Sequence, residues 1–113
     1  MSDCLFCKII AGEIPSKKLY EDDELLAFYD ISPQAPVHFL VIPKQHIDGA
    51  DCITEENADI VRTIFAKIPM LAKEAGITNG FRVVTNVLDD GGQSVRHLHF
   101  HVLGGAKLNV TFG

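Results

Sequence analysis

Apolar residues in this chain fall into several short runs and one longer segment with helical spacing. The short runs predict strands at residues 18–21, 25–29, 37–42, 81–87 and 99–103. The longer segment opens at Thr54, which can cap a helix, and its apolar stripe continues to Gly76, where we expect the helix to end. Pro69 inside this stripe is expected to kink the helix, and residues 6–11 predict a short helix or turn.

Five strands and one long helix, joined mainly by short turns, favour an α+β domain over a doubly wound parallel sheet, which needs more helices. We therefore expect residues 1–113 to form a single domain with a five-stranded, mainly antiparallel sheet, one long helix and a short N-terminal helix. The apolar stripe of the long helix should cover one face of the sheet and leave the other face for chemistry.

The segment His97-Leu98-His99-Phe100-His101-Val102-Leu103 carries three of the five histidines at alternate positions. On a strand these imidazoles would line one surface, with the middle ring able to reach a ligand and the outer two beside it. Near neutral pH, imidazole can act as base, acid, nucleophile or metal ligand. A His-x-His pair on one strand also suits a catalytic zinc site, so the spacing leaves a nucleophile and a metal site both open.

The loop Gly91-Gly92-Gln93-Ser94 lies just ahead of this histidine row. Paired glycines allow main-chain N–H groups to approach an anion, and Ser94 adds a hydroxyl donor, although an Asp-Gly-Gly sequence is also typical of a simple turn at 89–92. Asp30 can accept hydrogen bonds from ribose hydroxyls or cap the turn that follows it. Asn86 can bind phosphate or ribose or satisfy a turn, and the sequence does not separate these roles.

Charge, hydropathy and cysteine content restrict the ligands and the cellular setting that we expect for this protein. The formal charge of −5 argues against binding to a nucleic-acid polymer, and no apolar run is long enough to span a membrane. The chain begins Met-Ser-Asp, without the charged and apolar regions that are typical of a signal peptide. It has three cysteines, an odd number that cannot all be paired in disulfides within the chain. We therefore expect a cytoplasmic protein whose cysteines are thiols or metal ligands rather than disulfides.

The segment His-Leu-His-Phe-His-Val-Leu resembles the signature of the histidine-triad family of nucleotide hydrolases and transferases, His-φ-His-φ-His-φ-φ with φ apolar. The likeness extends through residues 6–14, 21–23, 30–36, 38–44 and 90–95, and it resembles the Hint branch in particular. Ser94 stands where the dinucleoside polyphosphate hydrolase branch has Thr, and Gly104-Gly105 where that branch has Pro-Arg.

The resemblance implies a histidine-triad fold and hydrolysis of purine nucleoside phosphoramidates, such as adenosine or guanosine derivatives, at the phosphorus–nitrogen bond. It makes His99 the nucleophile that becomes a nucleotidyl-histidine, with His101 at the phosphate and leaving group and His38 orienting His99. An imidazole attacks only when one ring nitrogen is unprotonated. No redox or organic cofactor is expected. The implied nucleotide-binding residues are Asp30, Ile31, Asn86, Gly92, Gln93, Ser94, His99 and His101.

Cys4-Leu5-Phe6-Cys7 has the two-residue gap of a zinc knuckle, although two such cysteines can also be free thiols or a redox pair. Some bacterial histidine-triad proteins bind structural zinc through two cysteines and two histidines. This resemblance implies a structural Zn²⁺ site at Cys4, Cys7, His46 and His97. Cys52 is expected to be an ordinary thiol.

The chain departs from the Hint pattern in its lack of Trp and in its tail, residues 104–113, so the resemblance leaves the leaving group open. Dinucleoside polyphosphate hydrolysis stays an alternative activity, and a zinc-stabilised nucleotide-binding module without turnover is an alternative of another class. Hint relatives join two sheets across a two-fold axis, so we expect a homodimer that uses the 81–87 strand and the long helix.

Overall fold

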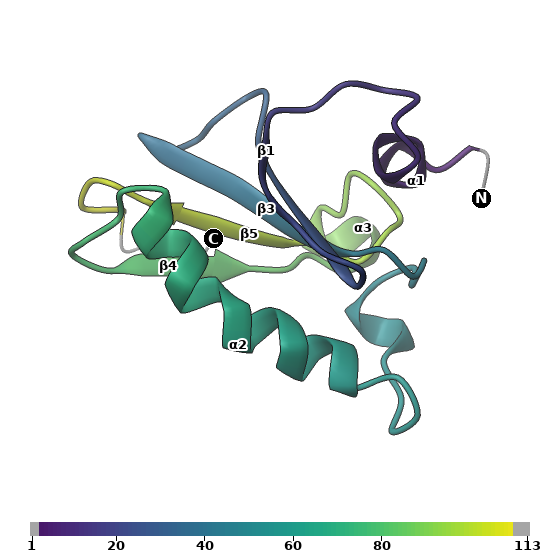
Figure 1. Cartoon of the computed structure of the whole chain (residues 1–113). Helices are drawn as coiled ribbons and strands as arrows, with labels where there is room; N and C mark the ends of the chain where they lie inside the picture. Colours follow the sequence, from purple (N-terminus) through teal and green to yellow (C-terminus); the bar gives the residue numbers. More distant parts are fainter. Residues whose placement is uncertain (1–2, 110–113) are drawn as a thin grey trace.

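The computed structural model of the protein describes residues 3–109, so residues 110–113 of the expected tail lie outside the described part. A five-stranded sheet with strand order β1-β2-β3-β5-β4 forms its centre, and each neighbouring pair is antiparallel (Figure 1). This confirms the predicted α+β class with an antiparallel sheet. The strands are β1 Lys18–Glu21, β2 Leu25–Tyr29, β3 Val37–Pro43, β4 Phe81–Val84 and β5 Phe100–Gly104.

The helices are α1 Leu5–Ile10, η1 Ala50–Cys52, α2 Asp59–Glu74 and α3 Leu88–Gly91. The long helix α2 and the short helix α1 lie on opposite sides of the sheet (Figure 1). Because neighbouring strand residues point to opposite faces, the sheet has two apolar cores. Helix α2 packs on Leu25, Ala27, Phe39, Val41, Phe100 and Val102, whereas α1 packs on Leu26, Phe28, Leu40 and Ile42.

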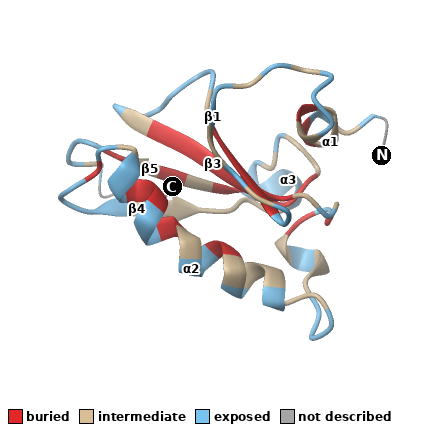
Figure 2. Cartoon of the chain, viewed as in Figure 1, coloured by how far each residue is buried: buried red, intermediate tan, exposed pale blue. Residues whose placement is uncertain are grey.

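Strand β3 is buried through most of its length, because it lies in the middle of the sheet and is covered on both faces (Figure 2). Pro43, which was expected to follow this strand, is its last residue. His38 lies on β3 and His101 on β5, on the face that α1 partly covers. The central strands therefore carry two imidazoles to the surface opposite α2, as the apolar stripe of that helix suggested.

The long helix begins later than predicted. Residues 55–58 form turns ahead of the helix, and the side-chain oxygen of Asn57 accepts a hydrogen bond from the main-chain N–H of Thr54 at 2.7 Å. The N-cap of the helix is Ala58 rather than Thr54. Helix α2 starts at Asp59 and runs through Pro69 to Glu74. Gly76 follows with φ of 92°, a left-handed conformation that ends the helix as expected.

One predicted strand is shorter in the structure, and another begins and ends one residue later than predicted. Strand β4 ends at Val84 rather than residue 87, and the predicted turn at 89–92 is the short helix α3, closed by Gly92 with φ of 76°. Strand β5 starts at Phe100, so His97 and His99 precede it. The prediction that three imidazoles share one strand surface was therefore wrong, because the ring of His97 is bound elsewhere in the fold.

Within residues 3–109, the structure holds no helix of sufficient length and apolar character to cross a membrane.

Candidate functional site

A pocket of about 250 Å³ lies between α1 and the histidine-bearing end of the sheet. Its apolar wall comes mainly from α1 and β2, and its polar end is formed by Ser94, His99 and His101. The pocket therefore has the character of a small-molecule site, with an apolar side and a few convergent polar groups. The lining residues are Leu5, Phe6, Ile9, Phe28, Tyr29, Asp30, Ile31, Leu40, Ser94, Val95, His99 and His101.

His99 lies in this pocket with one ring nitrogen engaged by the main chain. Its Nδ1 is 2.7 Å from the carbonyl oxygen of His97, which can only accept, so Nδ1 carries the proton and donates. Neutral imidazole carries only one proton, and Nε2 therefore keeps its lone pair. Burial lowers the pKa of His99 below its usual value. The ring is thus neutral near pH 7 and presents a nucleophilic nitrogen.

His38 and His101 form a hydrogen-bonded pair beside His99. The Nδ1 of His38 accepts from the main-chain N–H of Gln34 at 3.1 Å, so its Nε2 carries the proton and donates to Nδ1 of His101 at 2.9 Å. The Nε2 of His101 is consequently the protonated nitrogen of that ring. The predicted orientation of His99 by His38 is not found, because the contact partner of His38 is His101.

The pKa of His101 is lowered to about 4 by burial and, to a smaller extent, by the neighbouring His99 and His38. Burial also lowers the pKa of His38, with Asp30 acting in the opposite direction. All three rings are therefore neutral at pH 7. A phosphate anion beside His101 would favour its protonated form and raise its pKa again.

Asp30 takes the turn-capping role that its sequence position suggested, and its contact with ribose stays a prediction. Its Oδ1 accepts from the N–H of Ser32 at 2.7 Å and caps the following turn, while its Oδ2 lies 3.5 Å from Nε2 of His38. The residue also lines the pocket. Ile31 is 97% exposed at the pocket mouth, so its side chain is open to pack on a flat apolar ligand such as a base.

The predicted anion loop is only partly at the pocket. Ser94 lines it, whereas Gly92, Gln93 and Asn86 are not among the lining residues. The side chain of Gln93 is held by the protein itself: its amide nitrogen donates to the carbonyls of Asp48 and Val95 at 2.8 and 3.1 Å. Its oxygen accepts from the N–H of Leu88 and from Arg96. Gln93 therefore braces the loop, and nucleotide contacts of Gly92, Gln93 and Asn86 stay predictions.

Cys4, Cys7, His46 and His97 meet at the start of α1, with donor atoms all within 4.8 Å of one another. The sulfur of Cys4 lies 3.3 Å from Nδ1 of His97, and that of Cys7 lies 3.3 Å from Nδ1 of His46. The two Nδ1 atoms are 3.1 Å apart. The structure thus brings together all four residues for which the resemblance implied a zinc site.

The hydrogen bonds of the two histidines fit a metal site. The Nε2 of His97 lies 2.9 Å from the carbonyl oxygen of Pro43, and Nε2 of His46 lies 2.7 Å from Oδ1 of Asp48. Both acceptors require a protonated Nε2, which leaves the two Nδ1 lone pairs directed into the cluster. Two thiols and two imidazoles match the donor set of structural zinc. Burial and the neighbouring Cys4 raise the pKa of the Cys7 thiol to about 11, and a bound cation would reverse this shift.

Sequence reasoning missed three contributors to these sites. Phe6 packs edge-on against His99, with ring centroids 5.0 Å apart, and its position between Cys4 and Cys7 was a usable signal. Asp48 follows His46 by two positions and accepts from its ring. Arg96 forms a paired contact with Asp51 and lies 3.7 Å from the sulfur of Cys52, a pairing over a long sequence distance that no local pattern indicated.

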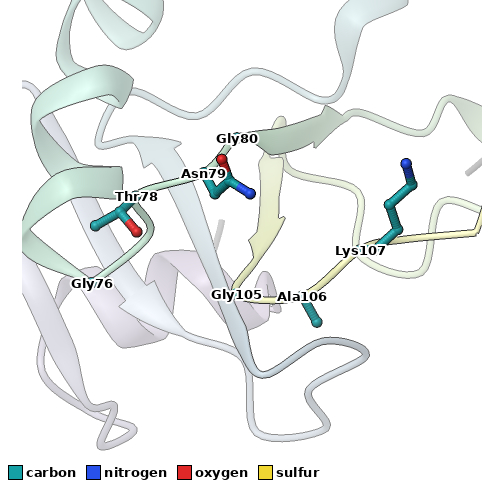
Figure 3. A pocket seen from close by; sticks show the side chains of 7 residues that line it. All are labelled: Gly76, Thr78, Asn79, Gly80, Gly105, Ala106 and Lys107. Atoms are coloured by element: carbon teal, nitrogen blue, oxygen red, sulfur yellow. The ribbon is translucent and has the colours of Figure 1, made fainter.

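A second hollow, of about 240 Å³, lies where the segment after α2 meets the segment after β5 (Figure 3). Glycine main chain forms much of its lining, and Thr78, Asn79 and Lys107 contribute polar side chains. Neither histidine nor cysteine lines this hollow. The candidate chemistry is therefore concentrated at the pocket beside α1.

Comparison with known proteins agrees with this site. The HIT domain family matches residues 11–108. Protein HitA of Neisseria gonorrhoeae is 44% identical over 104 residues, which cover 92% of this chain and 97% of that protein. A HIT family hydrolase from Clostridium thermocellum superimposes with a TM-score of 0.95 at 44% identity, covering 98% of this chain and 97% of the other. The chain therefore belongs to the HIT domain family.

A further relative is the 14 kDa zinc-binding protein of Brassica juncea, which is 45% identical over 109 residues and covers 95% of this chain and 96% of that protein. Family membership, together with a solved relative named as a hydrolase, supports a nucleotide-related hydrolase function for this chain. In this chain, the Cys4, Cys7, His46 and His97 cluster has the donor set of structural zinc.

Proposed function

We propose that this protein hydrolyses purine nucleoside phosphoramidates in the manner of the Hint branch, with His99 as the nucleophile. The observation that carries the proposal is the hydrogen bond from Nδ1 of His99 to the carbonyl of His97, which leaves the Nε2 lone pair available in a pocket shared with Ser94 and His101. A fixed, neutral imidazole is what covalent capture of a phosphorus centre requires.

In the first half-reaction Nε2 of His99 bonds to the α-phosphorus, and the phosphorus–nitrogen bond of the substrate breaks. His101, protonated when the phosphate anion enters, gives its proton to the leaving amine. Ser94 and the neighbouring main chain stabilise charge on the phosphate oxygens. Before His101 takes up its proton, the His38–His101 hydrogen bond holds the ring of His101 in its orientation.

In the second half-reaction a water molecule attacks the same phosphorus atom and gives its proton to His101. The bond between phosphorus and His99 then breaks, and a nucleoside monophosphate leaves with His99 restored. The two steps divide one difficult displacement into two easier ones. Asp30 and Ile31 line the pocket. In this proposal they hold the ribose and the purine, and the apolar residues of α1 and β2 contact the base.

Cys4, Cys7, His46 and His97 would hold one zinc ion, whose contribution is a cross-link between α1 and the segments that carry the two histidines. The proposed setting is a reducing cytoplasm, in which the cysteines stay thiols or metal ligands. The catalytic steps use the protein's own imidazoles and hydroxyl.

Turnover of a fluorogenic adenosine phosphoramidate should be compared with that of a diadenosine polyphosphate under the same conditions. We expect the phosphoramidate to be hydrolysed with the higher kcat/KM. Preference for the diadenosine compound would support dinucleoside polyphosphate hydrolysis instead. Tight nucleotide binding with no turnover of either compound would support a binding module.

A further inference from the structure

The metal cluster is built around the first turn of α1. Cys4 is the residue before the helix, and its sulfur accepts from the N–H of Cys7 at 3.4 Å. The sulfur of Cys4 contacts His97, and the sulfur of Cys7 contacts both His46 and His97. Leu5 and Phe6, which lie between the cysteines, line the proposed nucleotide pocket. The same turn of helix thus faces the metal cluster through its cysteines and the pocket through the residues between them.

Phe6 bridges the two sites directly. Its buried ring packs edge-on against His99, with centroids 5.0 Å apart and planes at 87°, and also against the cluster residue His97, with centroids 5.9 Å apart. On the sheet it contacts Phe28 at 5.5 Å. A displacement of Phe6 would therefore remove one of the surfaces that hold the His99 ring in place.

His97 provides a second connection. Its ring is completely buried, with Nδ1 in the cluster and Nε2 at the carbonyl of Pro43. Its own carbonyl oxygen accepts from Nδ1 of His99. The residue that joins the cluster through its side chain thus fixes the ring orientation of His99 through its main chain.

Helix α1 has little else to hold it. It has six residues, and a helix of this length is unstable without tertiary contacts. It contributes Phe6 and Ile9 to the smaller apolar core and is absent from the larger core that joins α2 to the sheet. Local opening of α1 is therefore expected to cost much less free energy than unfolding of α2 and the sheet.

We infer that the Cys4, Cys7, His46 and His97 cluster is a positioning centre for the nucleotide pocket, with Phe6 as its positioning residue. Zinc binding then raises the affinity for a nucleotide, and a nucleotide raises the affinity for zinc. This inference rests on the proposed function. Thermodynamic linkage requires the two effects to be the same factor, which we expect to be about tenfold.

The test uses adenosine monophosphate and zinc as probes, with a reductant that keeps the thiols free. Calorimetry gives the Kd for adenosine monophosphate with zinc-loaded protein and with protein stripped by a chelator. Competition with a chromophoric chelator gives the zinc affinity with and without the nucleotide. We expect stripped protein to bind the nucleotide about tenfold more weakly, and the nucleotide to tighten zinc binding by the same factor.

Three variants separate positioning from general stability. Phe6→Ala should still bind one equivalent of zinc, but zinc should change its nucleotide affinity by less than about threefold. Phe6→Leu keeps apolar bulk at this position and should restore the coupling. Phe65→Ala removes a phenyl ring from α2, where Phe65 contacts Phe100 on the other face of the sheet, and should keep the full wild-type coupling.

Equal nucleotide affinity with and without zinc would overturn the inference. Loss of the helical circular dichroism of α2 on stripping would also overturn it, because zinc would then hold the entire fold. Coupled binding without phosphoramidate turnover would contradict the proposed function and leave the inference standing. Phosphoramidate turnover with uncoupled binding would contradict the inference alone.

Discussion

The main-chain carbonyl oxygen of His97 accepts a hydrogen bond of 2.7 Å from Nδ1 of His99. This bond places the proton of His99 on the nitrogen away from substrate, so that Nε2 can attack. A carbonyl cannot donate, so the assignment of the proton follows from the chemistry of the partner. The same residue, His97, directs its own Nδ1 toward Cys4, and neighbouring histidines thereby acquire different chemical roles.

Replacement of His38 tests the hydrogen-bonded pair behind the pocket. His38→Asn removes the ring that donates to Nδ1 of His101, so His101 loses the partner that fixes its protonated nitrogen. We expect kcat for the phosphoramidate to fall by about 10- to 100-fold while KM changes little, since His38 does not line the pocket. Steady-state kinetics measure this, and an unchanged kcat would contradict the role assigned to the pair.

The pKa of His101 predicts how folding stability depends on pH. In the folded protein this pKa is about 4, against 6.5 in the unfolded chain. Between these values the unfolded chain binds more protons, so stability falls as the pH drops from about 6.5 to about 4. His101 contributes at most about 3 kcal/mol to this loss. Denaturant unfolding of zinc-loaded wild type and His101→Gln should show a shallower acid dependence in the variant, and identical slopes would contradict the pKa assignment.

Chelation tests the structural contribution of zinc. Protein purified without added metal should contain about one equivalent of zinc per chain, because the site has four donors of the kind that zinc prefers. Its removal should lower the Tm by about 10 °C or more. Cys7→Ser should lose the metal, whereas Cys52→Ser, outside the cluster, should retain it. A wild-type zinc content below about a tenth of an equivalent per chain, with no change in Tm on chelation, would contradict a structural zinc site.

A homodimer is expected because β4 lies at an edge of the sheet and Phe81 at its start is 42% exposed. Sedimentation at micromolar concentration should give twice the chain mass of 12.4 kDa. Phe81→Lys should shift the protein toward the monomer. A single 12.4 kDa species for the wild type would contradict the dimer.

Local sequence patterns were enough to predict much of the fold. The bounds of β1 and β2 agree with the apolar runs, and Phe100 and Val102 alternate with His101 as a strand requires. The start of α2 was missed because residues 55–58 form turns ahead of the helix, which begins only after Ala58. Patterns describe which positions are apolar, but they do not show which partner a polar side chain finds.

In the candidate site, too, the sequence predicted the types of residue better than their contacts. The family resemblance implied that Cys4, Cys7, His46 and His97 lie together, and the structure brings these four residues together. The contact of His38 with His101 depends on the register of β3 against β5, in which Leu40 lies opposite His101. The Gln93 side chain donates to the carbonyl of Asp48, a partner that only the folded loops bring close.

The central claim, attack by His99 on phosphorus, is tested most directly by trapping the covalent intermediate. Turnover of an adenosine phosphoramidate should be quenched rapidly in mild alkali and the intact protein weighed by mass spectrometry. We predict a population heavier by one nucleoside monophosphate, attached through an acid-labile phosphorus–nitrogen bond, and its absence in His99→Ala, which should bind nucleotide but not turn over. Near-normal turnover by His99→Ala, or a wild-type reaction that required added zinc in a folded protein and left no adduct, would contradict the account.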